Sequence, residues 1–399
     1  MSKTKGGGDL REYFSELRNF FRKGDMVLLM LCLVTSAYST VIIASATNAE
    51  KFGGSTRYIL LQIGASLIGA VLYALVSSLD LEKLSEHRVW LVAFNVFLLV
   101  LLLTPFGTDN NTGNRSWLDF PLIPFNIQPA EICKIAFVVI MASVMASHQN
   151  RLSSIPSVMH LVTHLFLIFG LNMVISSDLG VSLMFLFIFV GMAFSGGVNL
   201  LWFLLGGGLI VVAAPILFPL LSERQQDRFL YPYFPDIIDP QGLGAGYHTN
   251  QSLKSLTGGG MLGQGLFNGN RTQAGSLYAQ HTDFIFSSIG EELGYLGCAL
   301  VLLLLFAIVA RCVWVGMHSQ DYMRRLVCFG AASSLLFQVI LNVGMCIGVM
   351  PVIGLTLPFF SYGGSSVVSV YAMMGLVSGV HARPAAQSHE RYIRPPLKI

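Results

Sequence analysis

The chain has 399 residues, of which 54% are hydrophobic and only 11% are charged. Soluble globular domains carry about 25% charged residues, so the composition excludes a soluble domain and indicates a polytopic membrane protein. The formal net charge of +3 is too small to indicate a nucleic-acid partner. The 6 cysteines lie in or beside apolar runs without C-x-x-C spacing, and we expect them to be small buried hydrophobic residues.

The predicted fold is all-α, with ten transmembrane helices between a charged N-terminal tail (1–25) and a C-terminal tail (382–399). A helix is expected in each apolar run, because backbone polar groups in lipid must bond within their own segment. Each run is near the ~20 residues that cross the hydrocarbon core. The predicted spans are residues 26–47, 57–79, 89–105, 129–147, 157–176, 179–196, 199–221, 288–314, 326–348 and 364–381, which together form one domain over 26–381.

The distribution of Lys and Arg predicts the orientation of these spans. Ten spans place both termini on one side, where sixteen Lys and Arg residues fall, against seven on the other side. Cytoplasmic loops carry the excess of positive charge, so both termini are predicted to be cytoplasmic. Two extracytoplasmic loops are then long, 106–128 and 222–287. The second, between spans seven and eight, far exceeds the usual connection length, and we expect it to be functional or separately packed.

These loops contain clusters of glycine and proline. The second long loop has three glycines at 258–260 and others at 263 and 265, but it has neither a P-loop nor a dinucleotide-binding glycine motif. A nucleotide site is therefore not expected there. The last loop, 351–366, is rich in Pro and Gly, and irregular backbone is predicted. Such backbone survives at membrane depth only where protein buries it or where it lines a cavity.

Ionisable residues at the spans are candidates for a site, because charges in hydrocarbon are costly without a partner or a function. Glu131 and Lys134 are three residues apart and share a helix face. Either they serve the helix dipole and the membrane interface, or they pair in an internal cavity where Lys134 is available to an anion. Asp178, in a short link between two spans, either caps the next span or reaches the same cavity.

Asp283 lies in a polar stretch, 280–294, at the mouth of the eighth apolar run. It is either the cap of the helix that follows or a functional carboxylate. Desolvation near the interface would raise its pKa from about 3.9 toward neutrality, as a general base requires.

Several motifs in order along the chain resemble the SEDS family, which includes RodA, FtsW and SpoVE. They are Gln128-Pro-Ala-Glu-x-x-Lys134, His281-Thr-Asp-Phe-Ile-Phe286, Glu291-Glu-Leu-Gly294 and Pro358-Phe-Phe-Ser-Tyr-Gly-Gly-Ser-Ser366. Three further stretches resemble the RodA branch in particular: Asp239-Pro240, Leu243-Gly-Ala-Gly-Tyr-His248 and Trp117-Leu-Asp119.

The resemblance implies a ten-span peptidoglycan glycosyltransferase of the bacterial cytoplasmic (inner) membrane that polymerises lipid II for cell elongation and shape. It also implies a class B penicillin-binding protein as the partner that cross-links the product. The family's essential carboxylate falls on Asp283, and its cavity groups fall on Glu131 and Lys134. The further candidates for substrate binding are Arg115, Trp117, His281, Asp178, Ser361 and Ser365.

Three places depart from the family's pattern. Ser116 separates Arg115 from Trp117, whereas the family has Arg directly before Trp, so the role of this arginine is in question. The residues that precede Asp178 also differ from the family's Gln-Pro. The acidic residue that the family often has shortly before its His-Thr-Asp motif is absent before His281.

The expected reaction is an inverting displacement. The 4-hydroxyl of an acceptor lipid II attacks the donor's anomeric carbon, Asp283 takes the proton as general base, and undecaprenyl pyrophosphate leaves. The charge of the pyrophosphate is expected to be met by Lys134, by Arg115 and by a divalent cation, Mg²⁺ or Mn²⁺, held by Asp283 and the phosphates. The alternatives are a lipid II flippase or transporter, a division-type (FtsW-like) polymerase, and a scaffold that only activates its partner transpeptidase.

Overall fold

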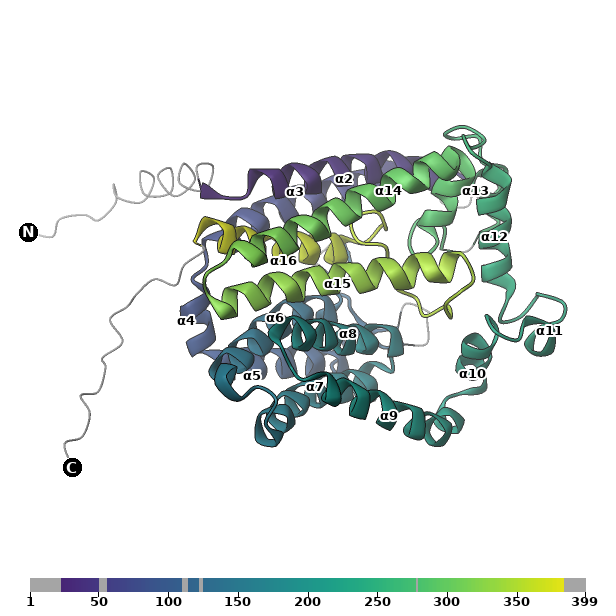
Figure 1. Cartoon of the computed structure of the whole chain (residues 1–399). Coiled ribbons are helices and arrows are strands. Elements are labelled where there is room, and N and C mark those ends of the chain that lie inside the picture. The colour runs from purple at the N-terminus through teal and green to yellow at the C-terminus, as the bar shows by residue number, and fades with distance from the viewer. Residues whose placement is uncertain (1–22, 50–55, 110–113, 122–124, 278, 384–399) are drawn as a thin grey trace, which may run out of the picture.

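The computed structural model describes residues 23–49, 56–109, 114–121, 125–277 and 279–383, and they form a bundle of long helices (Figure 1). The long helices are α2 (Met26–Ala46), α3 (Thr56–Ser78), α5 (Arg88–Val100), α6 (Pro129–Ser147), α7 (Ile155–Ser176), α8 (Leu179–Gly196), α9 (Leu200–Leu217), α14 (Ile285–His318), α15 (Tyr322–Cys346) and α16 (Gly364–Ala382). Short helical links are α4 (Leu81–Glu86), η2 (Leu101–Leu103), η3 (Gln149–Arg151) and η4 (Phe218–Leu220).

Eight helices among the described residues are long and apolar enough to cross a membrane. Two more apolar helices, Arg88–Leu103 and Leu200–Ile216, are shorter. Each of these helices coincides with one predicted span, and most helix ends differ from the predicted ends by only a few residues. A mostly helical, polytopic membrane fold is therefore confirmed, while the crossing of the two shorter helices stays a prediction.

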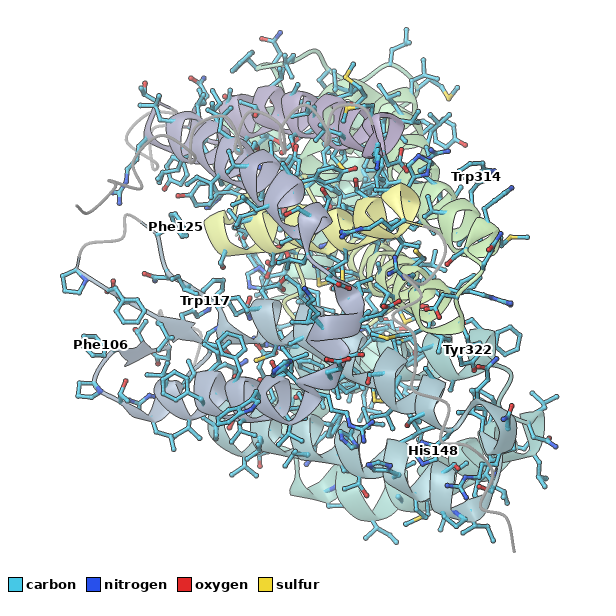
Figure 2. The ribbon with its side chains drawn as sticks, turned by 90° about the vertical axis from the view of Figure 1, so that its left-hand side faces the viewer. Phe106, Trp117, Phe125, His148, Trp314 and Tyr322 are labelled. Atoms are coloured by element: carbon cyan, nitrogen blue, oxygen red, sulfur yellow. The ribbon has the colours of Figure 1, made fainter. Side chains whose placement is uncertain are left out.

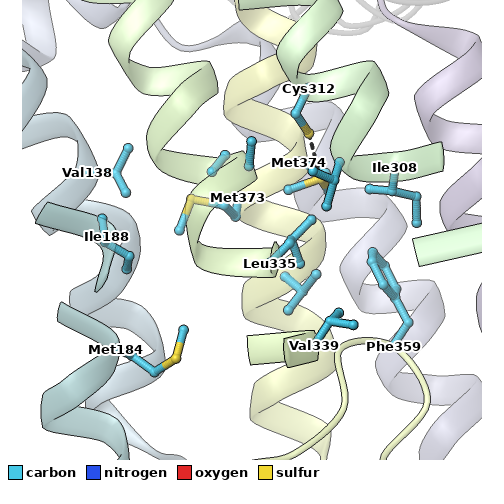
Figure 3. Close-up of a cluster of buried hydrophobic side chains, with 14 of the residues drawn as sticks. Val138, Met184, Ile188, Ile308, Cys312, Leu335, Val339, Phe359, Met373 and Met374 are labelled. Carbon is cyan, nitrogen blue, oxygen red and sulfur yellow. Dashed lines mark hydrogen bonds between the residues drawn. The ribbon is translucent and has the colours of Figure 1, made fainter. Parts of the chain in front are cut away.

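Burial separates inner helices from outer ones. The share of residues buried inside the protein, taken over an apolar stretch of 18 residues in each helix, is 78% in α6 and 83% in α16. It is only 22% in α3 and 28% in α7. Figure 3 shows part of this core, where Leu335 of α15 lies next to Met374 of α16. The large side chains of α9 are mostly exposed, as expected of a helix whose surface meets lipid.

Glycines allow α16 to pack closely on α3. A Cβ on Gly375 would lie 2.7 Å from the carbonyl oxygen of Tyr73, and one on Gly379 would lie 2.9 Å from that of Ser77. Both separations are shorter than real Cβ contacts. The two glycines are four residues apart on one face of α16, which is the small-residue spacing that brings membrane helices together.

The two long loops each contain secondary structure. The first pairs β1 (Gly107–Thr108) with β2 (Trp117–Leu118) in an antiparallel hairpin. The second folds into four helices at one end of the bundle, opposite α4 (Figure 1): α10 (Glu223–Leu230), α11 (Pro235–Ile238), α12 (Tyr247–Gly259) and α13 (Asn270–Gln273). This second loop is packed against the bundle through α12, which contacts α14 and α15, and through α13, which contacts α2 and α14.

The second long loop forms hydrogen bonds with α14 beside a break in that helix. The break is at Gly294, whose φ of 66° and ψ of −162° are not helical and favour glycine. Near the break, the backbone N–H of Gln264 donates to the carbonyl of Glu291, and that of Gly265 donates to the carbonyl of Glu292, both at 2.9 Å. The loop thus supplies donors to helical carbonyls beside the break.

Close contact between this loop and α14 requires glycine. A Cβ on Gly259 would lie 1.9 Å from the carbonyl oxygen of Gly290, and one on Gly263 would lie 2.1 Å from that of Glu292. Gly259 and Gly263, two of the glycines that stand out in the sequence, are therefore needed to seat the loop on the broken helix. This contact fixes the start of α14, where the predicted site lies.

Candidate active site

Three consecutive backbone carbonyls are held in place over His281–Asp283, just before α14. The first accepts a hydrogen bond from the backbone N–H of Tyr362 at 2.8 Å. The second accepts from the hydroxyl of Ser361 at 2.6 Å, and the third from the side-chain amide of Asn342 at 2.8 Å. We call these bonds the carbonyl clamp. It ties the segment that carries Asp283 to α15 and to the loop before α16.

The irregular loop 351–363 is itself held by amide side chains of α15. The amide of Asn342 also donates to the carbonyl of Leu355 at 2.6 Å. One turn earlier, the amide of Gln338 donates to the carbonyl and the hydroxyl of Thr356 at 3.0 and 3.2 Å. Both amide residues are fully buried. The predicted irregular backbone is confirmed, and buried protein groups satisfy it as the low polarity of the surroundings requires.

The backbone around Asp283 is fixed by hydrogen bonds, whereas its carboxylate is a free acceptor among the described residues. Its side chain is half-buried, and no described residue donates a hydrogen bond to either carboxylate oxygen. Burial, with a smaller contribution from the negative charge of Asp178, raises its pKa to about 6. A carboxylate with that pKa is mostly ionised at neutral pH and is a stronger base than an ordinary aspartate.

Asp178 takes the first of the two roles that were left open, the helix cap, and it is not among the residues that line the cavity beside Glu131 and Lys134. It caps α8, because its carboxylate accepts from the backbone N–H of Val181 at 3.1 Å. It also accepts from the hydroxyl of Ser116 at 3.1 Å, and that hydroxyl lies 2.6 Å from the hydroxyl of Ser176. Burial raises the pKa of Asp178 as well, against the effect of these hydrogen bonds. Asp178 is thus a second carboxyl group with a raised pKa, and its negative charge interacts with that of Asp283.

The start of α8, which follows Asp178, and the Asp283 side chain both contact the loop 351–363. A Cβ on Gly180, in the first turn of α8, would lie 2.5 Å from the carbonyl oxygen of Ile353. A Cβ on the next residue of that loop, Gly354, would lie 3.7 Å from a carboxylate oxygen of Asp283. The start of α8 and the start of α14 therefore meet across the irregular loop.

Glu131 and Lys134 form a buried ion pair in the first turns of α6. The Lys134 ammonium lies 2.8 Å from one carboxylate oxygen of Glu131, and the hydroxyl of Ser369 donates to the other at 2.8 Å. Glu131 also interacts electrostatically with Asp178. A small cavity beside the pair is lined by Glu131, Lys134, Ile135, Ser334, Leu335, Gln338, Ser369, Val370 and Met373. The predicted pairing is present, with a cavity next to it.

Arg115 and Trp117 lie in the hairpin of the first long loop. The guanidinium of Arg115 is exposed and donates to the backbone carbonyl of Thr104 at 2.8 Å, so it does not line the cavity. Trp117 pairs with Thr108 and is half-buried. Figure 2 places Trp117 with Phe106 at one end of the bundle. The inserted Ser116, and not the arginine, is the residue of this loop that contacts Asp178.

The remaining candidates lie around the start of α16 and the carbonyl clamp. The hydroxyl of Ser361 accepts from the backbone N–H of Leu357 at 2.7 Å while it donates to the clamp. The hydroxyl of Ser365 accepts from the backbone N–H of Gln128 at 3.3 Å, which joins α16 to the start of α6. The ring of His281 packs among aromatic rings near Asp283. In this structure the two serines hold backbone.

The paired glutamates in the same motif have a different task. Glu291 and Glu292 are each 1% exposed. Glu291 accepts from the backbone N–H groups of Arg271 and Thr272 at 2.8 and 2.9 Å, and Glu292 accepts from the hydroxyl of Ser45 at 2.5 Å. These carboxylates cap α13 and attach the second long loop to α2. They hold the loop rather than face the candidate base.

Sequence reasoning missed three residues of this site: Gln338, Asn342 and Ser116. A signal for the first two was present, since an amide inside an apolar run is costly unless it has a partner or a function. Both lie within the predicted span 326–348. No pattern in the sequence indicates that Ser116 reaches Asp178, because the contact joins residues 62 positions apart.

The chain is similar to known proteins over most of its length. MrdB of Escherichia coli strain K12, a peptidoglycan glycosyltransferase, is 32% identical over 364 residues, which cover 90% of this chain and 93% of MrdB. FtsW of Trichlorobacter lovleyi, a probable peptidoglycan glycosyltransferase, is 30% identical over 372 residues, which cover 92% of this chain and 96% of FtsW.

Solved structures of similar sequence have the same fold. One chain, from a peptidoglycan synthase complex that coordinates polymerization and crosslinking, matches with a TM-score of 0.74 and 28% identity over 90% of this chain and 98% of that chain. The rod shape determining protein RodA of Thermus thermophilus matches with a TM-score of 0.66 and 27% identity over 90% of this chain and 96% of that chain. The family model for FtsW, RodA and SpoVE matches residues 25–385, so the chain belongs to this family of cell cycle proteins.

Proposed function

We propose that this chain is a peptidoglycan glycosyltransferase that polymerises lipid II by inverting transfer, with Asp283 as the general base. The observation that carries the proposal is the Asp283 carboxylate, which has a raised pKa and no hydrogen-bond donor among the described residues, on a segment fixed by the carbonyl clamp. Relatives at 32% and 30% identity that carry this activity in their names support it.

The chemistry follows from the position of a single base. The 4-hydroxyl of the acceptor saccharide loses its proton to Asp283 as its oxygen forms the bond to the anomeric carbon of the donor. The bond to the pyrophosphate oxygen breaks on the opposite face, which inverts the anomeric centre. A positioned general base contributes about 10²–10⁴-fold to such a step.

The leaving pyrophosphate requires positive charge, and Lys134 is the cationic candidate that the structure supports best. Its ammonium is buried in a cavity wall and is bound to one carboxylate oxygen. A phosphate oxygen would compete with Glu131 for this cation in surroundings where electrostatic interactions are strong. Arg115, which donates to Thr104 at the surface, is a weaker candidate for this role.

A divalent cation, Mg²⁺ or Mn²⁺, is proposed as a cofactor shared with the substrate. The fit is partial: both oxygens of Asp283 are without donors from the described residues, yet no group of three His, Cys, Asp or Glu side chains among those residues is arranged to hold an ion. Asp283 would hold the ion together with the phosphates, which is how Mg²⁺ often binds. The ion would neutralise charge on the pyrophosphate.

The proposed topology has ten spans over 26–381, cytoplasmic tails at 1–25 and 382–399, and extracytoplasmic loops at 106–128 and 222–287. The excess of Lys and Arg on the side of the termini supports it. The tails lie largely outside the described residues. The protein is a multi-pass protein of the bacterial cytoplasmic membrane, consistent with its eight long apolar helices and its family.

The proposed partner is a class B penicillin-binding protein that cross-links the glycan. Support comes from the similar chain in a complex that coordinates polymerization with crosslinking. A role in elongation and cell shape is supported by the similarity to MrdB and RodA, while a division role is the alternative that the similarity to FtsW supports.

The experiment is a polymerisation assay with the purified full-length chain and lipid II, with and without its partner. Glycan strands longer than the disaccharide are expected from the wild type, and none from Asp283→Ala at an unchanged elution volume. A flippase would move lipid II between the leaflets of a vesicle and leave it chemically unchanged. Unaltered lipid II together with transfer between leaflets would therefore replace the proposal with that alternative.

A further inference from the structure

Three partly exposed aromatic rings form a closed triangle beside the candidate base. The ring centroids of Tyr58 and His281 are 5.3 Å apart, those of Tyr58 and Tyr362 are 5.0 Å apart, and those of His281 and Tyr362 are 5.7 Å apart. The ring planes cross at 75°, 64° and 49°. We call this set the aromatic triangle. Both contacts of Tyr58 are edge-to-face, which is a favourable geometry for aromatic pairs, and the contact between His281 and Tyr362 is tilted.

The triangle gathers three segments that are far apart in sequence. Tyr58 lies in the first turn of α3, His281 precedes α14, and Tyr362 precedes α16. Two of its members belong to the carbonyl clamp, because the backbone N–H of Tyr362 donates to the carbonyl of His281 at 2.8 Å. The triangle is thus rigidly attached to Asp283, which is two residues after His281 and half-buried as they are.

Packing alone does not require these residue types at this place. All three residues are only half-buried, so each keeps surface that solvent or a ligand can reach. Nearby, Phe359 and Phe360 are fully buried and fill the core of the same loop. The sequence therefore places purely apolar rings inside and rings with polar tips at the surface next to the base, which is the composition of a ligand-binding wall.

We propose that the aromatic triangle binds the saccharide of the acceptor substrate, by stacking against the C–H face of a pyranose ring. This inference rests on the proposed function, because it names the surface that presents the acceptor to Asp283. The reacting hydroxyl must come within hydrogen-bond distance of the base, about 2.6–3.2 Å. A pyranose ring that extends from that hydroxyl spans roughly the size of one aromatic ring, so a wall on the adjacent residues can hold it in line.

The test separates a binding wall from a packing cluster through single substitutions in the full-length chain. Tyr58→Leu removes a ring and keeps an apolar side chain, Tyr58→Phe keeps the ring, and Tyr362→Leu and Tyr362→Phe repeat the pair on another element. Tyr233→Leu is the matched control, since Tyr233 is 62% exposed in the second long loop, away from the triangle in sequence and in contacts.

Steady-state polymerisation of lipid II gives the first readout. Each Leu variant is expected to raise KM for lipid II roughly tenfold, which corresponds to about 1.4 kcal/mol of binding free energy, while kcat changes much less. Each Phe variant and Tyr233→Leu are expected to keep the wild-type KM. Equal losses in the Leu and Phe variants, or an unchanged KM in both Leu variants, would overturn the inference.

Direct binding gives a readout that does not depend on turnover. Lipid II in nanodiscs is titrated against Asp283→Asn with and without Tyr58→Leu, and the second substitution is expected to weaken binding about as much as it raises KM. An unchanged Kd would refute the triangle as a binding wall, even if activity fell. A lower thermal midpoint in that variant would then attribute the loss of activity to a destabilised fold. Failure of the wild type to polymerise lipid II would overturn both the proposed function and this inference, whereas an active wild type with unaffected Leu variants would overturn only the inference.

Discussion

The carbonyl clamp leads to a quantitative prediction for Asn342→Leu. The substitution keeps a buried side chain of similar size but removes the donor for two carbonyls, those of Asp283 and Leu355, which it bonds at 2.8 and 2.6 Å. Each buried carbonyl left without a donor costs about 1–3 kcal/mol, so the free energy of unfolding should fall by about 2–6 kcal/mol. The lower half of that range is expected, because the thiol of Cys346 stays 3.8 Å from the carbonyl of Asp283.

Turnover should fall further than stability alone explains. The third bond of the clamp sets the backbone that carries the base, and a displacement of about 1 Å can cost about 10²-fold in rate. Thermal unfolding in detergent and kcat for lipid II polymerisation would be measured on the same preparation. Gln62→Leu is the matched control, since the buried amide of Gln62 donates to the same loop at Phe359 (3.3 Å) but not to the clamp. An equal loss of kcat in both variants at comparable stability would refute the positioning role of Asn342.

Three further predictions follow from the same geometry. Because the pKa of Asp283 is raised to about 6 and only its ionised form accepts a proton, kcat/KM should be level above about pH 7, half-maximal near pH 6, and fall about tenfold per pH unit below about pH 5; a pH profile with no inflection between about pH 5 and 7 would contradict this. Gly263→Ala should prevent the loop from seating on α14, because its Cβ would lie 2.1 Å from the carbonyl oxygen of Glu292 at a φ of 82°. Gly197→Ala, at a φ of 85° with open space around it, should cost only about 1 kcal/mol in thermal unfolding. EDTA should abolish polymerisation without lowering the thermal midpoint of the chain, because the described residues contain no group of three metal-ligating side chains that would hold an ion in the absence of substrate. A lower midpoint would indicate a dedicated metal site.

The order and position of the long helices were predictable because lipid imposes a length and a composition on each span. The runs 26–47 and 57–79 became α2 (Met26–Ala46) and α3 (Thr56–Ser78). The eighth helix begins at Ile285, three residues before the predicted run 288–314, and its first turns carry the buried polar residues Ser287, Ser288, Glu291 and Glu292. Hydropathy does not register a helix whose first turns are covered by protein.

The candidate site was predictable in its residue types and less so in its contacts. The pairing of Glu131 with Lys134 follows from their spacing on one helix, and the structure contains it. The carbonyl clamp joins residues 59 to 81 positions apart and involves backbone atoms, which no sequence pattern identifies. The position of Arg115 was also beyond reach, since it lies before strand β2 and its guanidinium donates to the backbone carbonyl of Thr104, a tertiary contact. Local spacing survives folding unchanged, whereas tertiary contacts depend on how the helices pack.

The most direct measurement compares single-turnover transfer of lipid II by the wild type and by Asp283→Asn, at equal and saturating occupancy. If Asp283 removes the proton of the acceptor hydroxyl, the rate in the variant falls about 10²–10⁴-fold while lipid II still binds. Transfer at the wild-type rate in the variant would show that another group is the base.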